Sequence, residues 1–445
     1  MHSLRRRDTR AVRQLTLRVV VLGIVAVGSI TSPAAAGSPN AYIANTADGT
    51  VSVVNTNGNA VKKTIGPPSG NNPVGVAVAP GGQRIYVTDL GPDPSLTAID
   101  GRTNKIIETV SLPDGDAWGV AVNPAGTRVY VMHQSGSLSV LDATTSPMTL
   151  IGNFPIGSIE GAVGVVSPDG TRLYMTSSQN GFPYALSVLD TSNNNVVGQV
   201  DLNGLYPAAI AVSPDGSKVY VTGEHPSIAM DVIDTETLTL TTTVSCPDPP
   251  GCLARGVAVK PDGSQIYVAS DNGPLVIDST TYNLSYMQDL ADPDTCMNVP
   301  GGNIPWAVSV TPNGKRVYVT DEGNDSVFAI DLASYCVIKE IPVGAGPQAV
   351  GQFIDASPYS LSGRVKAAVK GAIVPLPTAT VILSRPGRAD SAVSDNKGKY
   401  SIPHLPGGVY TLTPTLTGCS FTPPSATITI QRKNTRAPTF VGACP

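Results

Sequence analysis

The feature that most constrains the fold is a tyrosine that recurs seven times, in short apolar segments at nearly constant spacing. The intervals are 44, 44, 44, 46, 47 and 51 residues, and the positions are Tyr42, Tyr86, Tyr130, Tyr174, Tyr220, Tyr267 and Tyr318. A period of about 40–50 residues with short strands and Gly/Pro turns is typical of a β-propeller, in which each repeat supplies one four-stranded blade. The sequence therefore predicts an all-β fold built on a seven-bladed β-propeller.

The clearest repeat is residues 208–244, where four strand-like segments follow one another. Residues 209–212, 218–222, 230–234 and 238–244 are rich in β-branched residues, as strands are. Residues 213–216 read Ser-Pro-Asp-Gly, a turn in which proline fixes φ and the aspartate side chain bonds back to the backbone. Copies of the first and third strands recur seven times along the chain.

The two ends of the repeat region complement each other. No first strand precedes the segment around Tyr42, and no tyrosine segment follows the last first strand, residues 348–354. We expect one blade to combine three N-terminal strands with this C-terminal innermost strand. Such a blade closes the ring and removes exposed sheet edges.

Residues 85–88, 219–222 and 317–320 read Ile/Val-Tyr-Val-Thr, and each follows a Pro-x-Gly turn. The pattern resembles YVTN-type β-propeller repeats over about residues 40–354. The asparagine of that name is retained only at Asn45. The resemblance implies an exported bacterial or archaeal protein.

The N-terminus also predicts export, to the periplasm, the cell surface or the medium. Five arginines between Arg5 and Arg13 precede an uncharged stretch, residues 19–30, and residues 33–37 read Pro-Ala-Ala-Ala-Gly. This order is that of a signal peptide cleaved after Ala36. The stretch is too short to span a bilayer as a helix, and no later segment has a membrane-spanning run.

The repeat stops after Ile354, and a second module follows. Residues 395–400 and 405–412 are turn-rich and resemble carboxypeptidase regulatory-like β-sandwich modules, which implies a spacer or adhesive unit without catalysis. We therefore expect a signal peptide over residues 1–36, a propeller over 37–355 and a small β-sandwich over 356–445. The predicted propeller has 13 basic and 30 acidic residues, a net charge of −17, whereas the last domain has 10 basic and 2 acidic residues, a net charge of +8.

All six cysteines would meet an oxidising compartment after export. Cys246 and Cys252 flank a short proline-rich loop, which suits a local disulfide. Cys419 and Cys444 are predicted to pair within the last domain, and Cys296 is left to meet Cys336.

A candidate ligand site follows from the repeat. In propellers, function gathers at the mouth of the central tunnel, where the loop entering each innermost strand meets the loop between the second and third strands. The residues just before the innermost strands are Val74, Trp118, Val163, Ala208, Arg255, Trp306 and Gln348. Both tryptophans of the chain fall on this ring, so Trp118, Arg255, Trp306 and Gln348 are predicted to stack on a planar or sugar-like ligand. The alternative is that the tryptophans plug the tunnel.

Polar residues near the mouth vary from blade to blade, as a site grafted on a repeat requires. Asp116, Glu160 and His225 are included in the predicted site, and the other polar candidates are Asp89, Asp114, His133, Glu224, Asp321 and Glu322. No catalytic residue, metal site or cofactor is predicted. Calcium is a minor alternative, at Asp321, Asp325 or residues 292–294, without EF-hand spacing.

The favoured interpretation is a non-catalytic binding or surface protein. The propeller mouth would present the face for a ligand or partner, and the basic domain would act as a spacer or envelope anchor. The partners expected are a protein or cell-envelope polymer and a small ligand, and we expect a monomer. The rival is a propeller hydrolase or lyase of lactonase type, or an accessory subunit of a redox enzyme. Single-stranded nucleic-acid binding through Trp118, Arg255 and Trp306 is disfavoured, since a −17 propeller repels a polyanion.

Overall fold

The structure is a computed structural model. It describes residues 39–444 except 67–71, 91–92, 157–161, 179–183, 247–251, 292–303, 355–358, 370–371, 386–387, 406–407 and 431–434. The predicted signal peptide, Glu160 and Cys296 lie outside the described residues.

Six four-stranded antiparallel sheets follow one another along the chain, each with its strands in sequence order. The first two are β4 (Pro73–Val78), β5 (Arg84–Asp89), β6 (Ser95–Asp100) and β7 (Lys105–Ser111), then β8 (Ala117–Val122), β9 (Arg128–His133), β10 (Ser137–Asp142) and β11 (Thr149–Pro155). The next two are β12 (Gly164–Val166), β13 (Arg172–Ser178), β14 (Tyr184–Asp190) and β15 (Asn195–Asp201), then β16 (Tyr206–Val212), β17 (Lys218–Glu224), β18 (Ile228–Asp234) and β19 (Thr239–Ser245). The last two are β20 (Ala254–Val259), β21 (Gln265–Ser270), β22 (Leu275–Asp278) and β23 (Leu284–Tyr286), then β24 (Pro305–Val310), β25 (Arg316–Asp321), β26 (Ser326–Asp331) and β27 (Val337–Pro342). The short helices α1 (Met287–Leu290) and η1 (Glu322–Asn324) lie in the connections.

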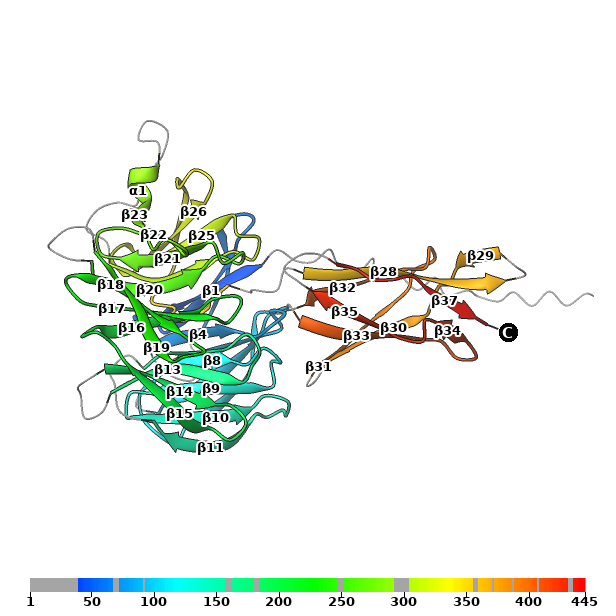
Figure 1. Ribbon diagram of the computed structural model, residues 1–445, viewed down its shortest axis with the longest axis horizontal. Coiled ribbons are helices and arrows are strands. Elements are labelled where there is room, and N and C mark those ends of the chain that lie inside the picture. Colours follow the sequence, from blue (N-terminus) through cyan, green and yellow to red (C-terminus); the bar gives the residue numbers. More distant parts are fainter. Residues whose placement is uncertain are drawn as a thin grey trace, which may run out of the picture. The chain divides into compact units, whose positions relative to one another are not determined.

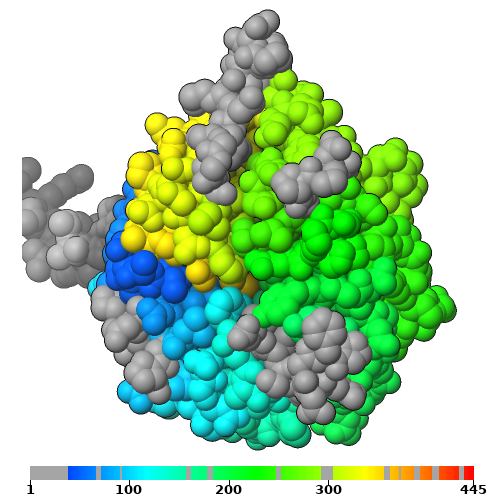
Figure 2. Space-filling model, turned by 90° about the vertical axis from the view of Figure 1, so that its left-hand side faces the viewer, coloured from blue at the N-terminus to red at the C-terminus, as the bar shows by residue number. Residues whose placement is uncertain are grey.

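The seventh blade joins the two ends of the repeat region, as predicted. Strands β1 (Asn40–Asn45), β2 (Thr50–Asn55) and β3 (Ala60–Ile65) form a three-stranded sheet. Residues 347–354 lie along β1 in antiparallel register, with bridges Ala41↔Ile354 and Asn45↔Pro347. Figure 2 shows the result face-on: the colours run from blue through cyan and green to yellow, and yellow lies beside blue. The prediction of a seven-bladed propeller closed by a C-terminal innermost strand is confirmed.

The repeated tyrosines are packing residues of the blades, each at most 2% exposed. Some also bind the next blade through their hydroxyl: Tyr42 donates to Asn104 Oδ1 at 3.0 Å, and Tyr318 donates to the Thr56 carbonyl at 3.0 Å. Arg316, two residues before Tyr318, donates to the same carbonyl at 2.7 Å. Because Arg316 lies on β25 and Thr56 follows β2, these bonds also close the ring (Figure 1).

The threonine of the repeat is buried and links the inner strands of neighbouring blades. Thr88 Oγ1 accepts from the Gly75 amide at 2.9 Å and donates to the Trp118 carbonyl of the next blade at 2.6 Å. The strands approach so closely here that a Cβ on Gly75 would lie 2.3 Å from the Trp118 oxygen. Glycine is therefore required at this position of β4 because any side chain would force the blades apart.

The last domain is a β-sandwich, as predicted. One sheet contains β28 (Tyr359–Val369), β29 (Ala372–Pro375), β37 (Phe440–Ala443) and β34 (Ser420–Thr422), with β32 (Lys399–Leu405) and β36 (Thr435–Arg436) also paired to β28. The other sheet contains β31 (Arg388–Val393), β30 (Thr380–Arg385), β33 (Gly408–Thr415) and β35 (Ala426–Ile430). The core between the sheets includes Leu361, Val365, Leu383, Leu412 and Phe440, all fully buried.

Two of the predicted disulfides are present. Cys246 bonds to Cys252 in the propeller, and Cys419 bonds to Cys444 in the sandwich. Cys336 is also disulfide-bonded; its predicted pairing with Cys296 stays a prediction because Cys296 is not described. No helix among the described residues has the length and apolar character needed to cross a membrane.

Candidate ligand-binding site at the propeller mouth

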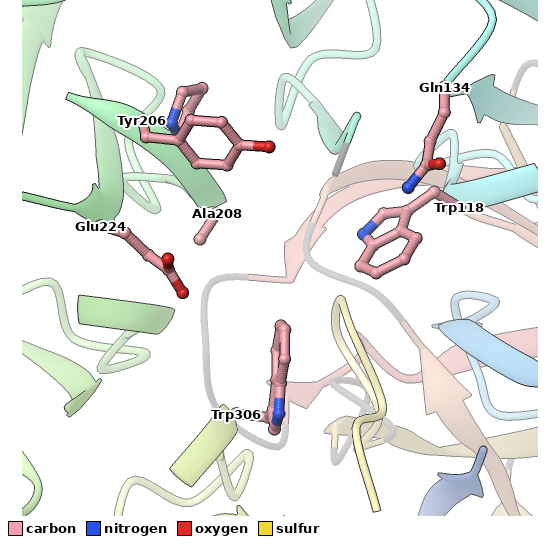
Figure 3. A pocket seen from close by; sticks show the side chains of 7 residues that line it. Trp118, Gln134, Tyr206, Ala208, Glu224 and Trp306 are labelled. Atoms are coloured by element: carbon pink, nitrogen blue, oxygen red, sulfur yellow. The ribbon is translucent and has the colours of Figure 1, made fainter. Parts of the chain in front are cut away.

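A pocket of about 320 Å³ lies where several innermost strands begin, and it is the predicted mouth. Its walls come from separate blades: Trp118 from β8, Trp306 from β24, and Tyr206, Pro207 and Ala208 from β16, with Gln134 after β9 and Glu224 at the end of β17. Figure 3 shows the two indoles and the phenol ring arranged around one open space. The volume is at the lower end of the range for small-molecule sites, about 300–1,000 Å³.

Trp118 is held in place through both its backbone and its side chain. Its carbonyl accepts the Thr88 hydroxyl bond, which fixes the backbone at the start of β8. Its half-buried side chain packs on a cluster of Val74, Val163 and Val350. Since these valines come from blades that are not all adjacent, they meet on the ring axis. Valines therefore fill the centre of the ring, and the Trp118 ring contributes to the pocket wall.

Trp306 lies in a short chain of charged partners. Its indole N–H donates to the Glu322 carboxylate. The Arg255 guanidinium lies 5.2 Å from the ring centroid, and its Nε donates to Glu224 Oε1 at 3.1 Å. The Arg255 side chain is 13% exposed and that of Glu224 41%, so the ion pair has a half-solvated carboxylate. Two carboxylates and one guanidinium leave this wall with a net negative charge.

Tyr206 was not predicted from the sequence. Its ring packs edge-on against Tyr184, with centroids 5.0 Å apart and an interplanar angle of 75°. Tyr206 is paired with Glu224 across the β16–β17 ladder, so the phenol and the carboxylate come together. The sequence contained a signal that could have identified Tyr206. It lies two residues before the ring position Ala208, and the predicted residue Asp116 lies two residues before the ring position Trp118.

Gln134 was also missed, although its repeat position carries a signal. It follows the last residue of β9, as Glu322 follows the last residue of β25. Its backbone N–H donates to the Asp116 backbone carbonyl at 3.1 Å. Asp116 itself is exposed and has φ +56°. Its connection to the pocket is the hydrogen bond that its backbone carbonyl accepts from Gln134.

Of the other predicted residues, Arg255, His225 and Gln348 do not line the pocket. His225 Nδ1 accepts from the Ser227 amide at 3.1 Å, within its own loop. Gln348 keeps its predicted ring position: its backbone N–H donates to the Ala44 carbonyl at 3.0 Å, and its backbone carbonyl accepts from Thr320 Oγ1 at 3.4 Å. Glu160 cannot be placed, since it lies outside the described residues.

His133 supports the loop that leads to Trp118. The ring is fully buried, with Nε2 2.9 Å from Ser139 Oγ and Nδ1 3.3 Å from the Gly115 carbonyl. Burial lowers the pKa of His133, and the Gly115 carbonyl and the Asp114 charge oppose that shift. The imidazole is therefore uncharged at neutral pH and stabilises this loop through its hydrogen bonds.

The described part of the chain contains no group of three or more His, Cys, Asp or Glu side chains placed to hold a metal ion. Asp321 accepts from the Ile304 and Gly323 amides at 3.1 and 3.0 Å, so its carboxylate shapes the mouth loops. Asp325 accepts from the Gly346 amide at 2.9 Å. The third calcium alternative, residues 292–294, is not described.

Comparisons with known proteins support the two-part architecture. Residues 360–441 match the family model of the carboxypeptidase regulatory-like domain. No curated protein matches the chain. Among solved structures, Kuenenia stuttgartiensis hydrazine synthase is similar with a TM-score of 0.55 and 19% identity, over 62% of this chain and 88% of that chain. A dihydro-heme d1 dehydrogenase, NirN in complex with DHE, has a TM-score of 0.49 and 14% identity, over 71% of this chain and 75% of that chain. At such identities the likeness to hydrazine synthase shows the propeller fold alone.

Proposed function

We propose that this chain is a non-catalytic binding protein of an extracytoplasmic compartment, and that the mouth pocket holds its ligand. The observation that carries the proposal is the convergence of Trp118, Tyr206 and Trp306, from three non-adjacent blades, on one pocket. Packing within a blade does not require large aromatic residues at half-exposed positions of the mouth. Aromatic walls with a few polar groups are typical of small-molecule sites.

The pocket chemistry favours a neutral, ring-shaped ligand such as a sugar residue. Indole and phenol faces offer flat apolar surfaces to the C–H face of a sugar ring. Glu224, on the side of Tyr206, and Gln134, on the side of Trp118, provide acceptor and donor groups for hydroxyls on opposite sides of the pocket (Figure 3). An anionic ligand is disfavoured because Arg255 is already paired with Glu224 and the wall is net negative.

Export and anchoring complete the proposal. The Cys246–Cys252 and Cys419–Cys444 disulfides suit an oxidising compartment. The basic last domain, with a net charge of +8, would act as a spacer or an envelope anchor for the acidic propeller.

Intrinsic tryptophan fluorescence tests the proposal directly, because the chain has two tryptophans and both line the pocket. The mature protein would be titrated with a panel of neutral mono- and oligosaccharides, using excitation at the red edge where tyrosine does not absorb. We expect a saturable change in emission and protection from acrylamide quenching for at least one sugar.

Matched variants locate the signal. Trp118→Phe and Trp306→Phe each leave one reporter and should each weaken binding, whereas Tyr335→Phe changes an aromatic residue of an outer turn and should not. If no sugar of the panel gives a saturable response, the proposed ligand class is refuted. Turnover of a bound sugar would replace the binding function with the hydrolase or lyase alternative.

A further inference from the structure

The outer face of the larger sheet in the last domain carries a row of basic side chains. Along β28, Leu361 and Val365 point into the core, whereas Ser362, Arg364 and Lys366 lie on the opposite face. Arg364 is directly opposite Lys399 of β32, and Ser362 is opposite Arg436 of β36. Side chains of directly paired residues project to the same face, so Arg364, Lys366, Lys399 and Arg436 share it. We call these four residues the basic face.

The pairing of Arg364 with Lys399 is unfavourable for the sheet by itself. Like charges directly opposite each other in an antiparallel pair destabilise it. The ion pairs found among the described residues all lie in the propeller, and the nearby Asp395 carboxylate interacts with the Lys399 charge without forming an ion pair. The neighbouring Asp395 carboxylate accepts from the Lys397 and Lys399 amides, both at 2.8 Å, and so closes its own turn. Retained repulsion of this kind is typical of a surface kept for binding rather than for stability.

We propose that the basic face binds a linear acidic polysaccharide. Lys399, Arg364 and Arg436 lie on three neighbouring strands, β32, β28 and β36, which are about 4.8 Å apart, so the cations form a row across the sheet that suits a polymer with regularly repeated anions. Guanidinium groups bind carboxylates in a bidentate manner, and two of the four residues are arginines. The inference rests on the proposed function, since it names the polymer that the anchoring domain would hold.

Two other polyanions fit the face less well. Nucleic-acid-binding sheets interleave basic with aromatic side chains for base stacking. Tyr400, Tyr410 and Phe440 are buried on the core side, and the partly buried Phe421 packs against the same core. A lipid surface would call for apolar residues among the cations, but the exposed Ile373, which pairs with Ala368 and shares this face, lies beyond Lys366 at the β28–β29 hairpin end.

The test uses the full mature chain and polygalacturonate, a linear polymer with one carboxylate per sugar. The variant Arg364→Thr/Lys399→Thr removes the central pair, and Lys62→Ser/Lys105→Ser removes two exposed propeller cations with the same change in net charge. We expect salt-sensitive binding by the native chain and the control. The central-pair variant should bind at least about tenfold more weakly, as loss of two charge-assisted contacts implies. Its thermal unfolding should be unchanged or raised, because the like-charge pair is gone.

Equal losses in both variants, or no binding by the native chain, would overturn the inference. The inference would also be overturned if the native chain bound anionic phospholipid vesicles or oligodeoxythymidine but did not bind polygalacturonate. Trp306→Phe separates this inference from the pocket: polygalacturonate binding should survive that change, and its loss would place the polymer at the mouth instead. Conversely, Arg364→Thr/Lys399→Thr should leave the tryptophan response to neutral sugars intact.

Discussion

Replacing Thr88 by valine removes a single buried hydroxyl that joins two blades. Valine matches threonine in shape, and Thr88 is fully buried on β5, so the change is mainly chemical. The hydroxyl is lost from both the Gly75 amide at 2.9 Å and the Trp118 carbonyl at 2.6 Å. In its place, a methyl group faces the Trp118 carbonyl oxygen at the short distance that suited a hydrogen bond.

The expected cost follows from those two contacts. A buried donor or acceptor left without a partner costs about 1–3 kcal/mol, and some of that is regained if the strands shift and find other partners. We therefore expect Thr88→Val to lower the free energy of unfolding by about 2–3 kcal/mol. Thr88→Ser keeps the hydroxyl and loses one methyl group, which should cost about 1 kcal/mol or less.

Urea denaturation followed by tryptophan emission measures this cost in the propeller, because the last domain contains no tryptophan. In a Trp306→Phe background the only emitter is Trp118, so the native spectrum also reports whether the pocket wall has moved. Thr64→Val, on the exposed outer strand β3, is the matched control and should be nearly neutral. A loss below about 0.5 kcal/mol for Thr88→Val, within the range of ordinary surface changes, would refute the linking role of the hydroxyl.

Two further predictions concern the same inner region. Gly75→Ala places a methyl group 2.3 Å from the Trp118 oxygen and should destabilise the propeller by about 1–3 kcal/mol, whereas Gly58→Ala, with nothing within 4 Å, should be tolerated; equal urea midpoints for the two variants would contradict the close approach. Because burial lowers the pKa of His133, the unfolded chain takes up a proton first as pH falls, so stability should be full above about pH 6.5 and decline below it. His133→Gln should flatten that decline between neutral pH and pH values where carboxylates begin to titrate; an unchanged slope in His133→Gln would show that another group is responsible.

Several parts of the fold followed from local patterns. The tyrosine period predicted seven blades, and the phase of the repeat predicted that residues 348–354 complete the blade formed by the three N-terminal strands. The Cys246–Cys252 bond followed from the short proline-rich loop between the two cysteines, which keeps them close together. Each of these features is encoded within one repeat or by a mismatch at its ends, so periodicity alone reveals it.

The site was predicted less completely. The ring positions of Trp118 and Trp306 were found from the repeat, and both line the pocket. Asp116 and His225 were included because they are polar and near the mouth, yet the pocket lining does not include their side chains. Proximity to the mouth along the chain says nothing about the direction of a side chain, which depends on loop backbone such as the positive φ of Asp116.

Repeat spacing thus specifies the number of blades, their order and the closure of the ring, because each blade is a local unit that differs little from the next. Only the closed tertiary structure decides which mouth residues face one another. Tyr206, Trp118 and Trp306 are about 90–190 residues apart in the chain and belong to non-adjacent blades. They share a pocket because strand curvature and the close inter-blade approach at Gly75 and Thr88 bring the inner strands around one axis.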